Sequence, residues 1–204
     1  MANEHPHMSE ERIVAPVKHW LETVVVGLDL CPFARKALLD SKVHFAVAWS
    51  QRRELLLERL AEEIHHLDEH PEIQTTLLIH PRALLNFEKY NQFLDLVDEL
   101  LERMDKEGVY QVASFHPQYA FEDVDIRDPA NYSNRSPYPI LHLLREDDVE
   151  AAIASHPDID SVPQKNIRVL REMGEQKLLK LLESCFHGID KIDESISLFK
   201  NDVN

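Results

Sequence analysis

The chain has 204 residues, with 22 Lys and Arg against 37 Asp and Glu, so its formal net charge is −15 at pH 7. Hydrophobic residues make up 44% of the chain, which is enough for the core of one domain. The acidity argues against duplex nucleic acid as the main partner, and no stretch is apolar for long enough to predict a membrane span. We expect no signal peptide, because the first residues lack a basic segment followed by an apolar one.

Hydrophobic periodicity predicts helices, and runs rich in β-branched and aromatic residues predict strands. Gly27 is the expected glycine at the end of the first helix. In chain order we expect a helix over 10–28, a short helix from 32, a strand over 42–49, a helix over 51–70, a strand over 73–80, a helix over 87–106, a strand over 109–115, an irregular loop over 117–138, a strand over 139–144, and helices over 147–154, 163–173 and 175–186.

This alternation of strands and helices predicts an α/β fold. Two strand–helix–strand units in series favour parallel strands joined by right-handed crossovers. We therefore expect a single domain over residues 10–187, with one four-stranded mixed but mostly parallel sheet flanked by helices. The direction of the fourth strand stays open. Residues 1–9 are expected to form a flexible leader, and residues 188–204 a weakly structured tail.

Ligands of open α/β sheets bind outside the carboxyl ends of the parallel strands. That rule selects the ends of the first three strands and the loop over 117–138, which is long enough to suggest a function. His and Arg gather at this expected edge despite the acidic charge, which suggests a small anionic ligand. The alternative is that the arginines pair with surface carboxylates. The expected edge residues are Arg52, His80, Arg82, His116, Tyr119, Asn134, Arg135 and Ser136, with His142 and Arg145 beyond.

Three side chains are candidate catalytic groups. His116 and His142 titrate near neutrality and suit acid–base work, although His142 lies among Leu and Ile and also fits a hydrogen-bonded core residue. Cys31 precedes Pro32, and at the cap of a short helix its thiolate would be favoured. The alternative for Cys31 is a buried apolar thiol. The expected substrate-binding residues are Tyr119, Asn134, Arg135, Ser136 and Arg145.

Neither a metal nor a cofactor is expected. Residues 66–70 read H-x-x-E-H, an inverted zinc-protease pattern, but no third ligand is identifiable. Asp123, Asp125 and Asp128 lack the glycine and the closing glutamate of a calcium loop. Two cysteines without a secretory signal predict reduced thiols and a cytoplasmic location.

Several long motifs resemble a known family. They are WLETVV at 20–25 with LCPFA at 30–34, SFHP at 114–117, NRSPYP at 134–139 and LHLLRE at 141–146. Over about residues 14–174 the chain resembles the bacterial proteins grouped as domain of unknown function 1415, for which the resemblance implies no reaction. It implies that the motif members include Cys31, His116, Asn134, Arg135, His142 and Arg145. Arg52, His80 and Arg82 lie outside these motifs.

We therefore expect an enzyme, or a degenerate enzyme, that acts on a small anionic metabolite at the carboxyl edge of the sheet. The alternative is a non-catalytic module that binds a ligand or a protein partner. A third hypothesis, metal-dependent hydrolysis through histidines, predicts bound zinc in the purified protein.

Overall fold

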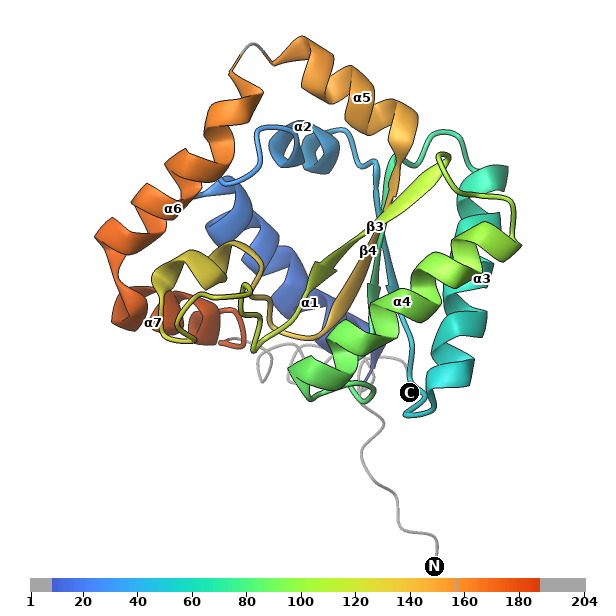
Figure 1. Cartoon of the computed structure of the whole chain (residues 1–204), viewed down its shortest axis with the longest axis horizontal. Helices are drawn as coiled ribbons and strands as arrows, with labels where there is room; N and C mark the ends of the chain where they lie inside the picture. The colour runs from blue at the N-terminus through green and yellow to red at the C-terminus, as the bar shows by residue number, and fades with distance from the viewer. Residues whose placement is uncertain (1–8, 157, 188–204) are drawn as a thin grey trace, which may run out of the picture.

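A computed structural model describes residues 9–156 and 158–187, and it has a four-stranded sheet with helices on both faces (Figure 1). The expected tail, and all of the expected leader except Ser9, lie outside the described residues. The strands are β1 (Val43–Val47), β2 (Thr75–Ile79), β3 (Tyr110–Phe115) and β4 (Ile140–Arg145). The helices are α1 (Glu10–Trp20), η1 (Leu21–Val26), α2 (Ala34–Leu39), α3 (Arg53–Glu69), α4 (Phe87–Arg103), η2 (Pro129–Ser133), α5 (Glu146–Ser155), η3 (Ile159–Ser161), α6 (Val162–Met173) and α7 (Glu175–Ser184).

The α/β class and the mixed four-stranded sheet are confirmed, but the expectation of a mostly parallel sheet is wrong. The strand order is β1-β2-β4-β3, and only β1 and β2 pair in parallel. β4 lies between β2 and β3 and is antiparallel to both. The physical reason is composition: the apolar β4 gains most from a central position, whereas β3 carries the polar Gln111 and Ser114, which an edge strand tolerates.

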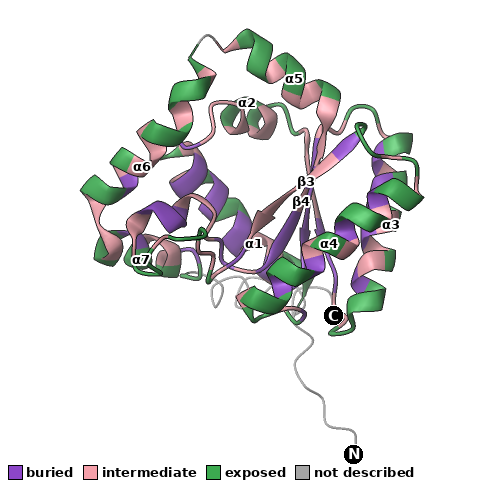
Figure 2. Cartoon of the chain, viewed as in Figure 1, coloured by how far each residue is buried: buried purple, intermediate pink, exposed green. Residues whose placement is uncertain are grey.

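The two faces of the sheet bury separate hydrophobic clusters, because side chains alternate along each strand. α3 and α4 cover one face, where Leu78 and Leu141 are fully buried. α1 and η1 cover the other face, where Ile79 and Ile140 are fully buried. Figure 2 shows the buried strands between these two layers. The two faces are called here the α4 face and the α1 face.

The first helix differs from its expected form. α1 passes at Leu21 into the π-helix η1, and Gly27 keeps ordinary right-handed helical angles (φ −64°, ψ −35°) rather than a left-handed cap. Glycine is needed there for a different reason: a Cβ atom would lie 2.2 Å from the carbonyl oxygen of Thr23. Within the described part of the chain, no helix combines the length and apolarity that crossing a membrane requires.

Candidate functional site

The predicted edge exists, and backbone hydrogen bonds define it. His80 directly follows β2, and its N–H donates to the carbonyl of Pro139 at 3.1 Å. His116 directly follows β3, and its N–H donates to the carbonyl of Asn134 at 3.1 Å. The carboxyl ends of β2 and β3 therefore meet the end of the loop over 117–138, on the lower side of the molecule in Figure 1.

An aromatic cluster lies at this edge on the α4 face. The His80 ring stacks on Tyr90 with centroids 5.7 Å apart, and Tyr90 contacts His116 at 5.1 Å. Phe87 and Tyr119 extend the cluster. Tyr90 comes from α4, and sequence reasoning missed it. Its hydroxyl donates to the carbonyl of Ile140 at 2.7 Å and accepts the N–H of Phe115 at 3.2 Å.

The imidazole of His116 is held by backbone groups on both sides. The N–H of Gln118 donates to Nδ1 at 3.0 Å, so the ring proton is on Nε2, which donates to the carbonyl of Leu84 at 3.1 Å. Burial lowers the pKa of His116, and the hydrogen bond to Leu84 opposes this only in part. A neutral, fully buried ring with both nitrogens occupied fits a structural role better than the expected acid–base role.

His80 differs from His116 in the hydrogen bonding of one ring nitrogen. Its Nδ1 lies 3.0 Å from the carbonyl oxygen of Ala83 and therefore carries the proton. Its Nε2 is buried and has no hydrogen-bond partner among the described residues. Burial lowers the pKa of His80 to about 4, although the hydrogen bond to the Ala83 carbonyl opposes this in part, so the ring is neutral at pH 7. Position at a strand end was the sequence signal for His80, but no role followed from it.

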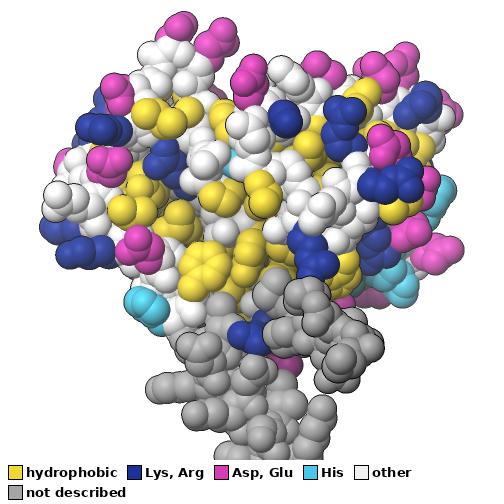
Figure 3. Space-filling view, turned by 90° about the horizontal axis from the view of Figure 1, so that it is seen from below, with side chains coloured by type: hydrophobic (Ala, Val, Ile, Leu, Met, Phe, Trp, Pro, Cys, Tyr) yellow, Lys and Arg dark blue, Asp and Glu magenta, His cyan; other side chains and the backbone are white. Residues whose placement is uncertain are grey.

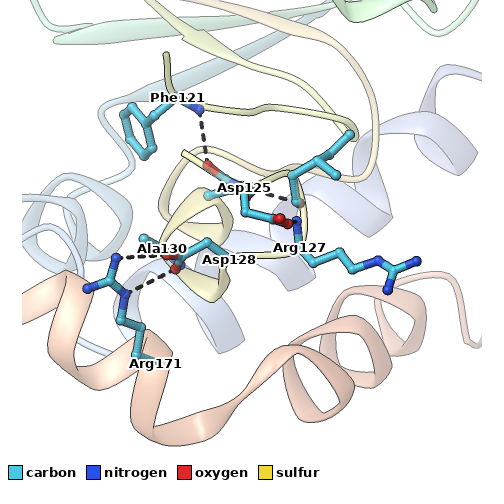
Figure 4. Close-up of polar contacts among 8 residues, drawn as sticks. Phe121, Asp125, Arg127, Asp128, Ala130 and Arg171 are labelled. Carbon is cyan, nitrogen blue, oxygen red and sulfur yellow. Dashed lines mark hydrogen bonds and ion pairs between the residues drawn. The ribbon is translucent and has the colours of Figure 1, made fainter. Parts of the chain in front are cut away.

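The loop over 117–138 is folded onto the edge rather than disordered. Asn131 is fully buried, accepts the N–H of Phe121 at 3.0 Å and donates to the carbonyl of Asp125 at 2.9 Å. Asp128 caps η2 and pairs with Arg171 of α6 at 2.7 Å (Figure 4). The loop is thus held by hydrogen bonds between its own residues and by an ion pair with α6.

The expected substrate-binding side chains of this loop mostly bind its own backbone. Arg135 donates from Nε to the carbonyl of Tyr119 at 3.1 Å and from Nη2 to that of Ile126 at 2.6 Å. Its guanidinium also lies over the Tyr132 ring, with 4.6 Å to the centroid. Nη1 makes no hydrogen bond to any described residue, so Arg135 keeps some binding capacity.

Three more of the expected substrate-binding side chains form hydrogen bonds within this region: Asn134, Ser136 and Tyr119. Asn134 donates to the carbonyl of Ser114 at 3.2 Å, and Ser136 donates to that of Tyr138 at 2.6 Å. Burial raises the pKa of the Tyr119 hydroxyl, and a hydrogen bond with Ser114 opposes this. These contacts fix the conformation of the loop next to β3.

Arg145 does not join this site, and its expected pairing with Arg135 around one anion is wrong. β4 runs antiparallel, so its end lies beside Tyr110 at the start of β3, on the opposite edge of the sheet. There the guanidinium donates to the carbonyls of Leu67, His70 and Ile73 and to the Tyr110 hydroxyl. These four hydrogen bonds join α3, the turn after α3 and the sheet.

His142 also lies apart from His116. Thr75 Oγ1 donates to the carbonyl of Leu143 at 2.6 Å, so the 2.7 Å contact between this oxygen and His142 Nε2 has the imidazole as donor. The ring contacts Phe115, which packs on the α1 face. Burial lowers the pKa of His142 to about 4. This geometry matches the alternative in which His142 is a hydrogen-bonded residue of the core.

The expected cap position of Cys31 is wrong. α2 begins at Ala34 with Phe33 as its cap residue, and its six residues make little dipole. Cys31 packs against the cluster on the α1 face, whereas His116 contacts α4, so the sheet separates the two groups and no nucleophile–base pair forms. Cys31 and Cys185 are both free thiols.

Arg52 and Arg82 complete the expected edge residues. Arg52 pairs with Glu54 at 3.6 Å, which is the alternative considered for these arginines. Arg82 is exposed and lies over the Trp49 ring, 5.5 Å from its centroid, with no carboxylate partner in the described part of the chain. The described residues able to hold a metal lie elsewhere, where β1 packs on α3.

Comparison with known proteins places the chain in a family without assigning an activity. Neither the curated proteins nor the solved structures gave a match. One family model matches residues 12–180, a span that includes Cys31, His116, Arg135 and Arg145 and confirms the resemblance. The chain therefore belongs to the family described as Protein of unknown function (DUF1415).

Proposed function

We propose that this protein is an enzyme, or a degenerate enzyme that retains its binding site, acting on a small anionic molecule at the carboxyl edge of the sheet. The observation that carries the proposal is the buried Nε2 of His80, which has no hydrogen bond to a described residue. Leaving such an atom unpaired costs about 1–3 kcal/mol, and unpaired polar atoms in a folded protein call for an explanation such as catalysis or a bound group. His80 replaces His116 as the candidate base.

Two arginines supply the anion-binding groups in this proposal. Arg82 follows His80 by two residues and is exposed. Arg135 is partly exposed and has an unused Nη1. Neither forms an ion pair with a carboxylate of the described chain, although the protein has 15 more acidic than basic residues. Figure 3 looks onto this edge: hydrophobic side chains with a few Lys and Arg among them occupy much of its middle, and Asp and Glu lie mainly toward the rim.

The setting proposed for this activity is the bacterial cytoplasm, which two free thiols support. The proposed ligand is a small anion rather than nucleic acid or a membrane. A protein partner is compatible with the same edge.

The second candidate function is a non-catalytic module that binds a ligand or a protein. One observation favours it: His80 and His116 are fully buried, so a substrate reaches Nε2 only after the covering segments move. A binding module needs the surface arginines but not the imidazole.

A thermal-shift titration with inorganic phosphate and small carboxylates tests the anion site. A tenfold excess over the dissociation constant stabilises by about 1.4 kcal/mol, which raises Tm by about 3–6 °C. We expect this rise in the wild type and its loss in Arg82→Gln and Arg135→Gln. Arg103→Gln, which changes an exposed arginine at the end of α4, is the matched control and keeps the rise. If no anion shifts Tm, or all three variants respond equally, the anion site is wrong.

NMR of the imidazole nitrogens separates the enzyme from the binding module. With the stabilising anion bound, the enzyme proposal expects the Nε2 resonance of His80 to move, because the nitrogen gains a partner. His116, whose nitrogens are already bonded, serves as the internal reference. An Nε2 signal of His80 unchanged at saturation selects the binding module.

A further inference from the structure

A second polar cluster lies far from that edge, where the edge strand β1 packs on α3. His44 is the second residue of β1, and Glu63 and His66 are three residues apart on α3. This spacing places both α3 side chains on one helix face, directed at the strand. One ligand atom from each of the three lies within 4.8 Å of the other two. The cluster is called here the His–Glu–His cluster.

Two buried polar atoms of this cluster have no hydrogen-bond partner among the described residues. Glu63 is only 2% exposed, and its Oε1 binds Arg59 at 2.6 Å. Its Oε2 has no hydrogen bond to a described residue, and His44 Nε2 lies 3.4 Å from it. The buried Nδ1 of His66 also lacks a hydrogen-bond partner among the described residues. Two unpaired buried atoms side by side are unusual in a folded protein.

Glu63 is buried but has a cationic partner, because the guanidinium of Arg59 binds its Oε1 at 2.6 Å. Arg59 also fixes the orientation of the carboxylate, as partners of metal ligands commonly do. A negative oxygen thus faces two imidazoles.

The cluster is open to solvent on one side. A surface cavity of about 540 Å³ is lined by His44, Arg59, Glu62, Glu63, His65, His66 and Glu69. The side chain of His44 is 33% exposed, so an ion has a path to the buried oxygen of Glu63. Water can also reach the same point.

The donor set and spacing match one class of ion. Two imidazole nitrogens and one carboxylate oxygen are the protein ligands of open zinc sites, with bonds of about 2.0–2.2 Å. Two such ligands at a tetrahedral angle lie about 3.4 Å apart, and the observed separation of His44 Nε2 and Glu63 Oε2 is 3.4 Å. Magnesium and calcium prefer oxygen ligands alone, so they fit poorly.

We propose that His44, Glu63 and His66 bind one divalent transition-metal ion, with zinc as the best match, and leave a fourth position open toward the cavity. This site does not depend on the function proposed at the carboxyl edge. An open position would hold water, which zinc activates for hydrolysis. His70, whose ring lies 4.3 Å from that of His66, binds Glu72 through Nδ1 and stays outside the ligand set.

Metal titration of the full chain, stripped with a chelator, tests the site. We expect zinc to bind one to one by calorimetry, and cobalt to give the visible spectrum of a four-coordinate ion. His44→Gln, Glu63→Gln and His66→Gln should each weaken binding by more than about 100-fold, and Arg59→Gln by about 10–100-fold. His19→Gln, which changes an exposed histidine on α1 outside this cavity, is the matched control and should bind like the wild type. His5→Gln/His7→Gln should also bind normally, which excludes those two histidines as the source.

Two results would overturn the proposal. One is the absence of one-to-one binding by the wild type at micromolar zinc. The other is binding that His19→Gln or the His5/His7 variant weakens as much as His66→Gln. A measurement on the wild type alone keeps the test valid even if a variant misfolds. The ring NMR signals of His44 and His66, but not of His116, should shift on zinc addition. Unmoved His44 and His66 signals contradict the site.

Discussion

Two histidine clusters in this protein use the same side chain in opposite ways. At the carboxyl edge, both ring nitrogens of His116 bind backbone groups, and the ring is fully buried. At the junction of β1 and α3, a buried nitrogen of His66 has no hydrogen-bond partner among the described residues and lies near a carboxylate and an open cavity. Local hydrogen bonding, rather than residue type or position at a strand end, therefore decides whether an imidazole nitrogen is available to bind a ligand. His80 is intermediate, because one ring nitrogen is hydrogen-bonded and the other has no partner within residues 9–156 and 158–187.

The largest expected effect concerns a backbone-bound cation. Arg145→Ala removes the guanidinium that binds the carbonyls of Leu67, His70 and Ile73. Unpaired carbonyls in this partly buried region should lower the free energy of unfolding by about 3–5 kcal/mol, measured by urea denaturation. Arg82→Ala, which removes an exposed guanidinium, should change it by less than about 0.5 kcal/mol. Similar losses in the two variants would contradict the structural role of Arg145.

A pair of histidine variants tests the comparison directly. His116→Leu leaves the Leu84 carbonyl and the Gln118 N–H unpaired, so we expect a loss of about 2–4 kcal/mol in unfolding free energy. His66→Gln in metal-free protein breaks no hydrogen bond of Nδ1 and should cost less than about 1 kcal/mol. Urea denaturation of the chelator-treated proteins measures both. Equal costs would mean that the two clusters are both structural.

Most of the fold was predictable because local patterns determine it. The strand near Val43 and the long helix from Phe87 agree with their expected ranges within a few residues. Strand order was not predictable, because the apolar composition of β4 favours a central position but fixes neither its neighbours nor its direction. The passage of α1 into a π-helix also escaped prediction, since its apolar spacing resembles that of an ordinary helix.

The site was predictable only in its location. The strand-end rule placed His80 and His116 together, but which nitrogen is bonded depends on carbonyls of the segment after β2. The same rule missed the His–Glu–His cluster. The H-x-x-E-H pattern pointed to His66, yet its partners are Glu63, one turn earlier, and His44 on another element. Spacing along one helix cannot reveal a ligand that a strand supplies.

The smallest expected effect is a pH dependence that isolates His80. Its pKa is lowered from 6.5 to about 4 by burial, so the unfolded chain binds a proton more tightly than the folded protein does. The neutral ring therefore supports stability above pH 6.5, and this contribution is lost as the pH falls toward 4. Between pH 7 and pH 5 the loss for one such histidine is about 2 kcal/mol.

His142, with a pKa of about 4, contributes in the same direction, so the wild type alone cannot assign the effect. The difference between the wild type and His80→Gln can assign it, because the variant lacks only the protonation of His80. We expect urea denaturation at pH 7 and pH 5 to show a drop that is about 2 kcal/mol smaller in His80→Gln than in the wild type. The exposed His65→Gln should keep the full drop. If His80→Gln keeps it as well, the Nε2 of His80 already has a proton-accepting partner when folded, and the candidate base at the carboxyl edge becomes another structural imidazole like His116.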